Sequence, residues 1–134
     1  MSEPKRRFFD LHSAAPTVIS AGSVIVGDVR GEGDYVVFGE VHGDGELGGG
    51  FNLAATGVWN GHVRALAAII AGKITGGLAV KGKLEIGYTA VIRGSVSART
   101  IAIAKGAIVE GDIEVTSGVP VQEFEEKRNS DSGA

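Results

Sequence analysis

The chain has 134 residues and a net charge of −3, which is enough for one folded domain with flanking segments. Glycine occurs 22 times and proline 3 times, a composition that favours turn-rich β structure over a disordered tract. The absence of cysteine excludes disulfides, thiolate metal ligands and cysteine nucleophiles. No apolar run reaches the roughly 18 residues of a membrane-spanning helix, and the first residues lack the apolar region of a secretory signal. We therefore expect a soluble, cytoplasmic protein.

Residues 1–16 are predicted to form a flexible tail that contains three bases beside two aromatic rings. Such a cluster could attract anionic lipid at the inner face of the cytoplasmic membrane and insert its rings among the headgroups. Each base near such a surface contributes ~1 kcal/mol, so many copies on a polymer would bind far better than one. The alternative is a solvated arm without a partner. Nucleic acid binding is not expected, because the next base is Arg30. The candidate membrane residues, called here the basic-aromatic segment, are Lys5, Arg6, Arg7, Phe8 and Phe9.

From residue 17 to residue 118, short runs of alternating apolar residues recur between glycines. The runs cover residues 17–31, 35–43, 51–65, 68–80, 84–98 and 101–115, with a loose corner at residues 48–50. The last two runs match position by position, because Ile101 follows Leu84 at the same interval at which Gly111 follows Gly94. Apolar residues at every second position indicate strands with one buried face. A period this short, below that of helical repeats, suits one turn of a β-solenoid, so we predict an all-β domain of about six stacked coils.

Residues 119–134 are predicted to form a disordered C-terminal tail. The period is lost at Val119, and Pro120 cannot donate the backbone hydrogen bond of a further ladder. Charged residues then lead into a polar end of Ser, Asn, Asp and Gly.

The order of several glycine motifs across residues 17–115 resembles the bactofilin family. The matching segments are residues 17–22, 27–34 and 39–44 at the start and 94–98 and 106–113 at the close. The resemblance implies a single-stranded right-handed β-helix that polymerises end to end into filaments without nucleotide. It further implies a bacterial cytoskeletal scaffold, not an enzyme, that is often found at the membrane. Partners implied in this way are other copies of the chain, other bactofilins and cell-wall or appendage machinery.

The two terminal coils are the predicted polymer contacts, because a solenoid end exposes unpaired backbone groups over an open core and neither tail offers an evident cap. Both ends are also acidic: the charge is −5 over residues 17–50, +6 over residues 51–109 and −3 over residues 110–114. Salt should therefore promote assembly by screening this repulsion. The predicted interface residues are Ile19, Val24, Ile25 and Val29 at the N-terminal end, and Ile108, Val109, Ile113 and Val115 at the C-terminal end.

Four other patterns favour a structural interpretation, so no cofactor or metal is expected. Gly43, Gly45 and Gly48 have the spacing of a dinucleotide fingerprint, and residues 77–83 resemble a phosphate-binding loop, but no helix is predicted after either. The histidines His12, His42 and His62 fall at different points of the coil, and solvated surface positions are favoured over a zinc site. A solvated face is also favoured over a calcium site for the acids of the first two coils, Asp28, Glu32, Asp34, Glu40, Asp44 and Glu46.

The main alternative function is a trimeric acyltransferase of the left-handed β-helix type. Residues 86–91 and 103–108 each resemble the hexapeptide repeat of those enzymes. The hexapeptides do not tile the chain, however, and no histidine after Arg64 could act as the general base that such enzymes use.

Overall fold

The computed structural model describes residues 16–124, and within that range every regular element is a β-strand. Most strands have three to five residues because each coil must turn several corners, and three strands have eight residues. Their bounds are β1 (Thr17–Ile19), β2 (Val24–Val26), β3 (Val29–Gly31), β4 (Tyr35–Val37), β5 (Glu40–His42), β6 (Gly45–Leu47), β7 (Gly50–Leu53), β8 (Val58–Ala65), β9 (Ala67–Ile70), β10 (Lys73–Val80), β11 (Lys83–Ile86), β12 (Val91–Ala98), β13 (Thr100–Ala104), β14 (Ile108–Glu110), β15 (Ile113–Val115) and β16 (Gln122–Phe124).

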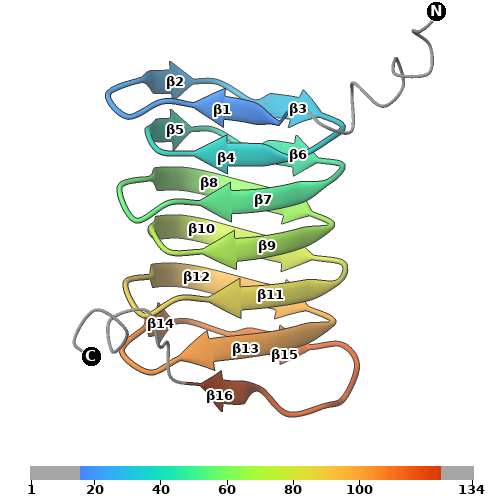
Figure 1. Cartoon of the computed structure of the whole chain (residues 1–134). Helices are drawn as coiled ribbons and strands as arrows, with labels where there is room; N and C mark the ends of the chain where they lie inside the picture. The colour runs from blue at the N-terminus through green and yellow to red at the C-terminus, as the bar shows by residue number, and fades with distance from the viewer. Residues whose placement is uncertain (1–15, 125–134) are drawn as a thin grey trace, which may run out of the picture.

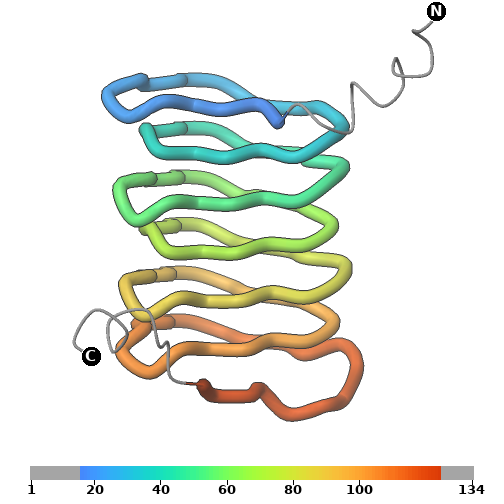
Figure 2. The backbone as a smooth tube through the Cα atoms, viewed as in Figure 1, coloured from blue at the N-terminus to red at the C-terminus, as the bar shows by residue number. Residues whose placement is uncertain are grey.

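Two parallel sheets enclose the core, and the chain passes once through each sheet in every coil (Figure 1). The first sheet has seven strands in the order β1-β4-β7-β9-β11-β13-β16. The second has nine strands, with β14-β12-β10-β8-β5-β2 as its main path and β3, β6 and β15 beside it. In Figure 1 the chain crosses the front sheet from right to left, returns behind it from left to right and moves down the view, so the coil is right-handed. The predicted β-solenoid of about six coils is confirmed, and the stacked loops are plain in the backbone trace (Figure 2).

The predicted repeat sets the register of the last coils. Leu84 pairs with Ile101 in the seven-stranded sheet, and Val96 pairs with Ile113 in the other, so both sheets keep the interval that the sequence shows. The coil length varies nearer the N-terminus, where Tyr35 pairs with Phe51 and the interval is one position shorter. The difference is absorbed at corners, so the alternation of inward and outward side chains is kept in register from coil to coil.

The core is a continuous column of apolar side chains between the two sheets. Trp59 is fully buried and makes an edge-to-face contact with Phe51, with ring centroids 5.3 Å apart at an interplanar angle of 81°. Its indole nitrogen donates a hydrogen bond of 2.9 Å to the carbonyl oxygen of Gly43, so this polar group is satisfied inside the core. The buried residues of the described chain are all apolar or aromatic, as a stack of half-buried strands requires.

One corner of every coil is built on a glycine with positive φ. At this corner φ lies between 134° and 153°, a region that L side chains rarely adopt. The glycines also stack so closely that a Cβ atom on Gly94 would collide with the carbonyl oxygen of Gly76 in the preceding coil. This glycine column therefore allows both the bend and the close stacking. Its members are Gly27, Gly43, Gly61, Gly76, Gly94 and Gly111.

The structure continues the solenoid past the predicted boundary at residue 118. β16 pairs in parallel with β13, with Ala102 beside Gln122 and Ala104 beside Phe124, a longer interval than in the preceding coils. Pro120 precedes this strand, so its missing N–H does not interrupt the ladder. Residues 122–124 thus form a strand inside the segment that was predicted to be a tail from residue 119, and residues 125–134 lie outside the described part of the chain.

Candidate assembly faces and the surface between them

The N-terminal face is formed by the first coil, and three of its four predicted interface residues belong to the core. Ile19 is buried, and Ile25 and Val29 are partly buried against the core. Val24 differs: its side chain is 58% exposed and lies beside Glu40 on the outer side of the nine-stranded sheet. Because successive strand residues point to opposite faces, Val24 and Ile25 cannot both face the core.

The C-terminal face, made by the last coil, shows the same division. Val109 and Val115 pack partly against the core, and Ile113 continues the inward column of Val96 while remaining 40% exposed. Ile108 pairs with Val91 on the outer side and is 47% exposed. Apart from the buried Ile19, the inward residues among the predicted contacts are therefore apolar side chains that the core covers only in part.

The outermost strands also present backbone hydrogen-bonding groups at both ends. Within residues 16–124, β1, β2 and β3 have sheet neighbours on their C-terminal side alone, and β14, β15 and β16 on their N-terminal side alone. Such edges are templates for pairing with another chain. Glu123 is an exception to the open apolar ends that the sequence predicts. It pairs with Ile103, so a carboxylate stands where the preceding strands of the seven-stranded sheet have an apolar residue.

Charged residues near the two ends are mostly solvent-exposed. At the C-terminal end, Glu110 forms an ion pair with Arg93, whose Nε lies 3.1 Å from the glutamate oxygen. Asp112 and Glu114 carry exposed acidic side chains in the same coil. At the N-terminal end, Arg30 on β3 adds one positive charge to the acids of the first coil.

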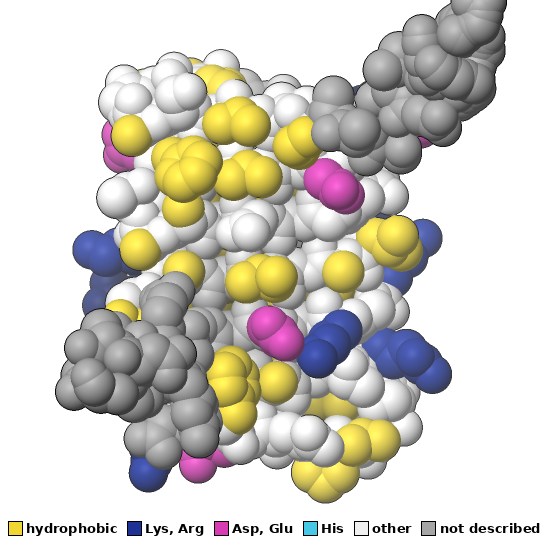
Figure 3. All heavy atoms as spheres, viewed as in Figure 1, with side chains coloured by type: hydrophobic (Ala, Val, Ile, Leu, Met, Phe, Trp, Pro, Cys, Tyr) yellow, Lys and Arg dark blue, Asp and Glu magenta, His cyan; other side chains and the backbone are white. Residues whose placement is uncertain are grey.

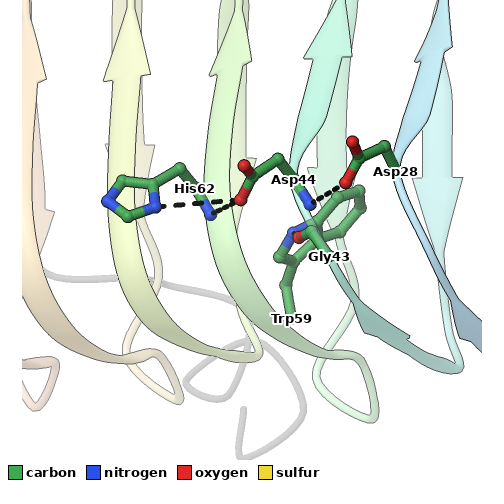
Figure 4. Close-up of polar contacts among 5 residues, drawn as sticks. All are labelled: Asp28, Gly43, Asp44, Trp59 and His62. Carbon is green, nitrogen blue, oxygen red and sulfur yellow. Dashed lines mark hydrogen bonds and ion pairs between the residues drawn. The ribbon is translucent and has the colours of Figure 1, made fainter.

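Three candidate calcium-binding aspartates instead join neighbouring coils through the backbone. The Asp34 carboxylate accepts a hydrogen bond of 2.8 Å from the N–H of Gly50, and the other two aspartates are drawn in Figure 4. The Asp28 carboxylate accepts a hydrogen bond of 3.1 Å from the N–H of Asp44. The Asp44 carboxylate in turn accepts one of 3.1 Å from the N–H of His62, whose ring Nδ1 lies 3.8 Å from the same oxygen. These side chains replace ladder hydrogen bonds at the corner where the backbone bends, which is a structural role.

The other candidate ligands and glycine motifs are also placed by the coil. His42 lies 3.0 Å from the Asn60 side-chain nitrogen and 3.7 Å from Glu40, and His12 lies outside the described residues. No group of three or more potential metal ligands occurs in residues 16–124. In the same range, no helix follows the glycines at positions 43, 45 and 48 or the lysine-containing residues 77–83, which belong to strands and corners.

The outer face of the seven-stranded sheet carries a feature that the sequence did not indicate. Exposed apolar side chains, among them Val18, Phe38 and Ile69, lie on and beside this face, and hydrophobic groups gather over its upper part in Figure 3. A groove of about 430 Å³ crosses β4, β7, β9 and β11 on the same face. We call it the sheet groove. It lies between the terminal coils, so end-to-end contact would leave it open.

Comparison with known proteins gives a consistent result. A family model described as "Bactofilin: Polymer-forming cytoskeletal" matches residues 17–114. The chain is 31% identical over 101 residues to bactofilin BacO of Myxococcus xanthus (strain DK1622), and the alignment covers 75% of this chain and 80% of that protein. No solved structure matches the chain significantly.

The basic-aromatic segment lies outside the described residues, and no helix in residues 16–124 is long and apolar enough to cross a membrane.

Proposed function

Because the chain belongs to the bactofilin family of polymer-forming cytoskeletal proteins, we propose that it assembles end to end, without nucleotide, into filaments or sheets that act as a scaffold. The scaffold would position cell-wall, cell-shape or appendage machinery, and its first partner is a second copy of the same chain. The protein has no catalytic role in this proposal.

The observation that carries the proposal is the open core at both terminal coils. Ile25 and Val29 at one end, and Ile113 and Val115 at the other, continue the inward columns of the core but are covered on one side only. Burying one such side chain fully is worth about 1.5–3 kcal/mol relative to full exposure. A second coil stacked on either end would cover these groups and would also extend both parallel sheets.

Charge opposes this contact without preventing it. The acids near both ends are exposed, so their repulsion acts through water and is screened by salt. One of them, Glu110, is already compensated by Arg93 within the same molecule. Apolar burial and backbone pairing supply the attraction, and the charges set how strongly assembly depends on ionic strength.

The right-handed coil argues against the acyltransferase alternative, because the hexapeptide enzymes have left-handed coils. The histidines at positions 42 and 62 lie on strands of the outer surface, and each already contacts a carboxylate or amide of a neighbouring residue. The family relationship is to structural proteins.

A peripheral membrane contact through the basic-aromatic segment, Lys5 to Phe9, is part of the proposal. The segment combines positive charge with aromatic rings, which is the composition that binds anionic interfaces. A polymer would present many copies of this weak ligand at once, which makes the attachment strong only after assembly.

Sedimentation and negative-stain electron microscopy of the purified full chain, without nucleotide or metal, test the proposal. We expect thin, extended filaments. A stable trimer of fixed size would overturn the filament model and favour the acyltransferase alternative, which binding of an acyl donor would then check.

A further inference from the structure

The sheet groove owes its shape to two small residues. Gly50 and Ala67 are neighbours on β7 and β9, between the larger side chains of Asp34 on one side and Lys83 on the other. The second row of the groove contains Val36, Asn52, Ile69 and Glu85, which all point outward from the sheet. The small size of Gly50 and Ala67 therefore leaves a depression in the surface of the sheet, and the row that contains Val36 and Ile69 borders it.

The lining is largely apolar, with the Asp34 carboxylate at one end and the Lys83–Glu85 ion pair at the other. Val36 and Ile69 form one wall, and Ile69 is 49% exposed although its neighbours in the strand are buried. Asp34 and Glu85 contribute carboxylates, and Lys83 lies 3.3 Å from Glu85 in an ion pair. A largely apolar site with a few charged groups fits an aromatic side chain that has a positive charge nearby.

The start of the described chain lies at the groove itself. Pro16, the first described residue, is one of the lining residues, so residues 1–15 connect directly to this site. Phe9 precedes Pro16 by about seven positions, and an extended chain spans at most ~3.6 Å per residue, giving a reach of about 25 Å. The distance from β1 to β11 is four strand spacings, or about 19 Å. Phe8 and Phe9 can therefore reach every part of the groove.

We propose that the basic-aromatic segment of the same molecule docks in the sheet groove, with a phenylalanine ring against Val36 and Ile69 and a neighbouring base beside Asp34 or Glu85. The short connection gives the segment an effective concentration in the millimolar range, which favours it over a segment from another copy. The docked segment lies on the side of the solenoid, so docking does not obstruct the terminal coils. This inference is independent of the filament model, but docking and the proposed membrane contact use the same segment and therefore compete with each other.

Cysteine pairing tests the proposal cleanly, because the natural chain contains no cysteine. We compare the full-length double variant Asp10→Cys/Asn52→Cys with Asp10→Cys/Ala55→Cys, because Asp10 follows Phe9 and Asn52 lies beside Ile69, so both variants keep the proposed contact residues. Ala55 is an exposed corner residue next to the same sheet but outside the groove. Under mild oxidation, we expect an intrachain disulfide to form about tenfold faster in the first variant, measured on non-reducing denaturing gels and by mass spectrometry. Equal rates in the two variants, or mainly interchain dimers, would overturn the proposal.

A second measurement does not depend on disulfide geometry. Trypsin cleaves after Lys5, Arg6 and Arg7, and docking should slow this cleavage in the folded chain. Ala67→Phe fills the groove with a side chain from the sheet and should accelerate cleavage several-fold, whereas Ala55→Phe should leave the rate unchanged. Ala67 is exposed, so the larger side chain does not disturb the core. The same cleavage rate in all three proteins would show that the segment does not occupy the groove.

Discussion

The indole ring of Trp59 occupies the space that a side chain at position 45 would need. Gly45 and Trp59 lie in adjacent coils, and a Cβ atom on Gly45 would approach Cζ2 of Trp59 to 2.7 Å. Gly45 stands in an inward column otherwise made of larger residues, with Val29 on one side and Val63 on the other. The largest side chain of the core is thus accommodated by a glycine in the preceding coil.

Replacing Gly45 with valine should destabilise the protein by about 1–3 kcal/mol, because the added side chain overpacks the site of Trp59. Trp59→Ala should cost about 3–5 kcal/mol through the cavity that it leaves. Urea unfolding followed by circular dichroism gives both values. Gly50→Ala serves as the control: its Cβ would meet only the Asp34 side chain, and we expect a change below about 1 kcal/mol. Similar losses at positions 45 and 50 would show that the Trp59 contact is not the cause.

The glycine column predicts a large effect for Gly94→Ala. Position 94 combines a φ of 138° with a collision between the new Cβ and the backbone of Gly76. A backbone carbonyl cannot move aside as a flexible side chain can, so we expect a loss of about 2 kcal/mol or more. At Gly22 φ is also positive, but nothing lies within 4 Å of the Cβ position. The variant Gly22→Ala should therefore unfold at a higher urea concentration than Gly94→Ala, and the reverse order would contradict the stacking argument.

Ile25 and Val24 form a matched pair for the assembly interface, since they are adjacent in β2 but face opposite sides. Ile25→Arg places a charge in the open core of the first coil and should shorten or abolish filaments. Val24→Arg places the same charge on the outer side and should leave filaments unchanged in electron micrographs and sedimentation. Ile113→Arg and Ile108→Arg provide the equivalent comparison at the other end. Equal effects within each pair would mean that the terminal core is not the contact.

Salt should promote assembly. From about 0.1 M to about 1 M salt the Debye length falls from about 10 Å to about 3 Å, which screens repulsion between the acidic ends. We expect the pelleted fraction to rise over this range for the natural chain. Asp112→Asn/Glu114→Gln should raise the fraction at low salt and flatten its salt dependence. A pelleted fraction that falls steadily with salt would contradict the charge argument.

Substituting Lys5, Arg6 and Arg7 together with serine should weaken binding to anionic vesicles by about 3 kcal/mol per copy, at ~1 kcal/mol for each base. Vesicle co-sedimentation at low salt measures the change, with neutral vesicles as a reference. The triple substitution of Lys73, Lys81 and Arg99 removes the same charge from the solenoid and should have little effect. If both triple variants lose binding equally, total charge and not the basic-aromatic segment is responsible.

The sequence contains enough information for the fold and for the register of the later coils. Leu84 and Ile101 occupy matching places between matching glycines, and alternation assigns one face of each strand to the core. The same alternation places Ile25 toward the core and Val24 on the outer side. The predicted N-terminal interface included both residues and so did not apply the alternation there. β16 was missed because its distance along the chain from β13 departs from the period and Glu123 interrupts the apolar pattern.

The sheet groove could not be predicted in the same way. It depends on Gly50 and Ala67 being neighbours, and these residues lie a full coil apart in the chain. A small residue on the outer side of a single strand does not change the alternating pattern of that strand, so neither residue can be recognised from its own segment. The depression exists only once the coils are stacked and the volume missing from two strands is combined.

The chain has one tryptophan, and its position makes it a natural optical probe. Trp59 is fully buried on β8, with further strands of its own sheet stacked on both sides. Its fluorescence should therefore respond to loss of the core and remain unchanged when molecules join or separate at their ends. Intrinsic fluorescence can report unfolding while light scattering reports polymer mass in the same cuvette. The two processes can thus be resolved without attaching a dye.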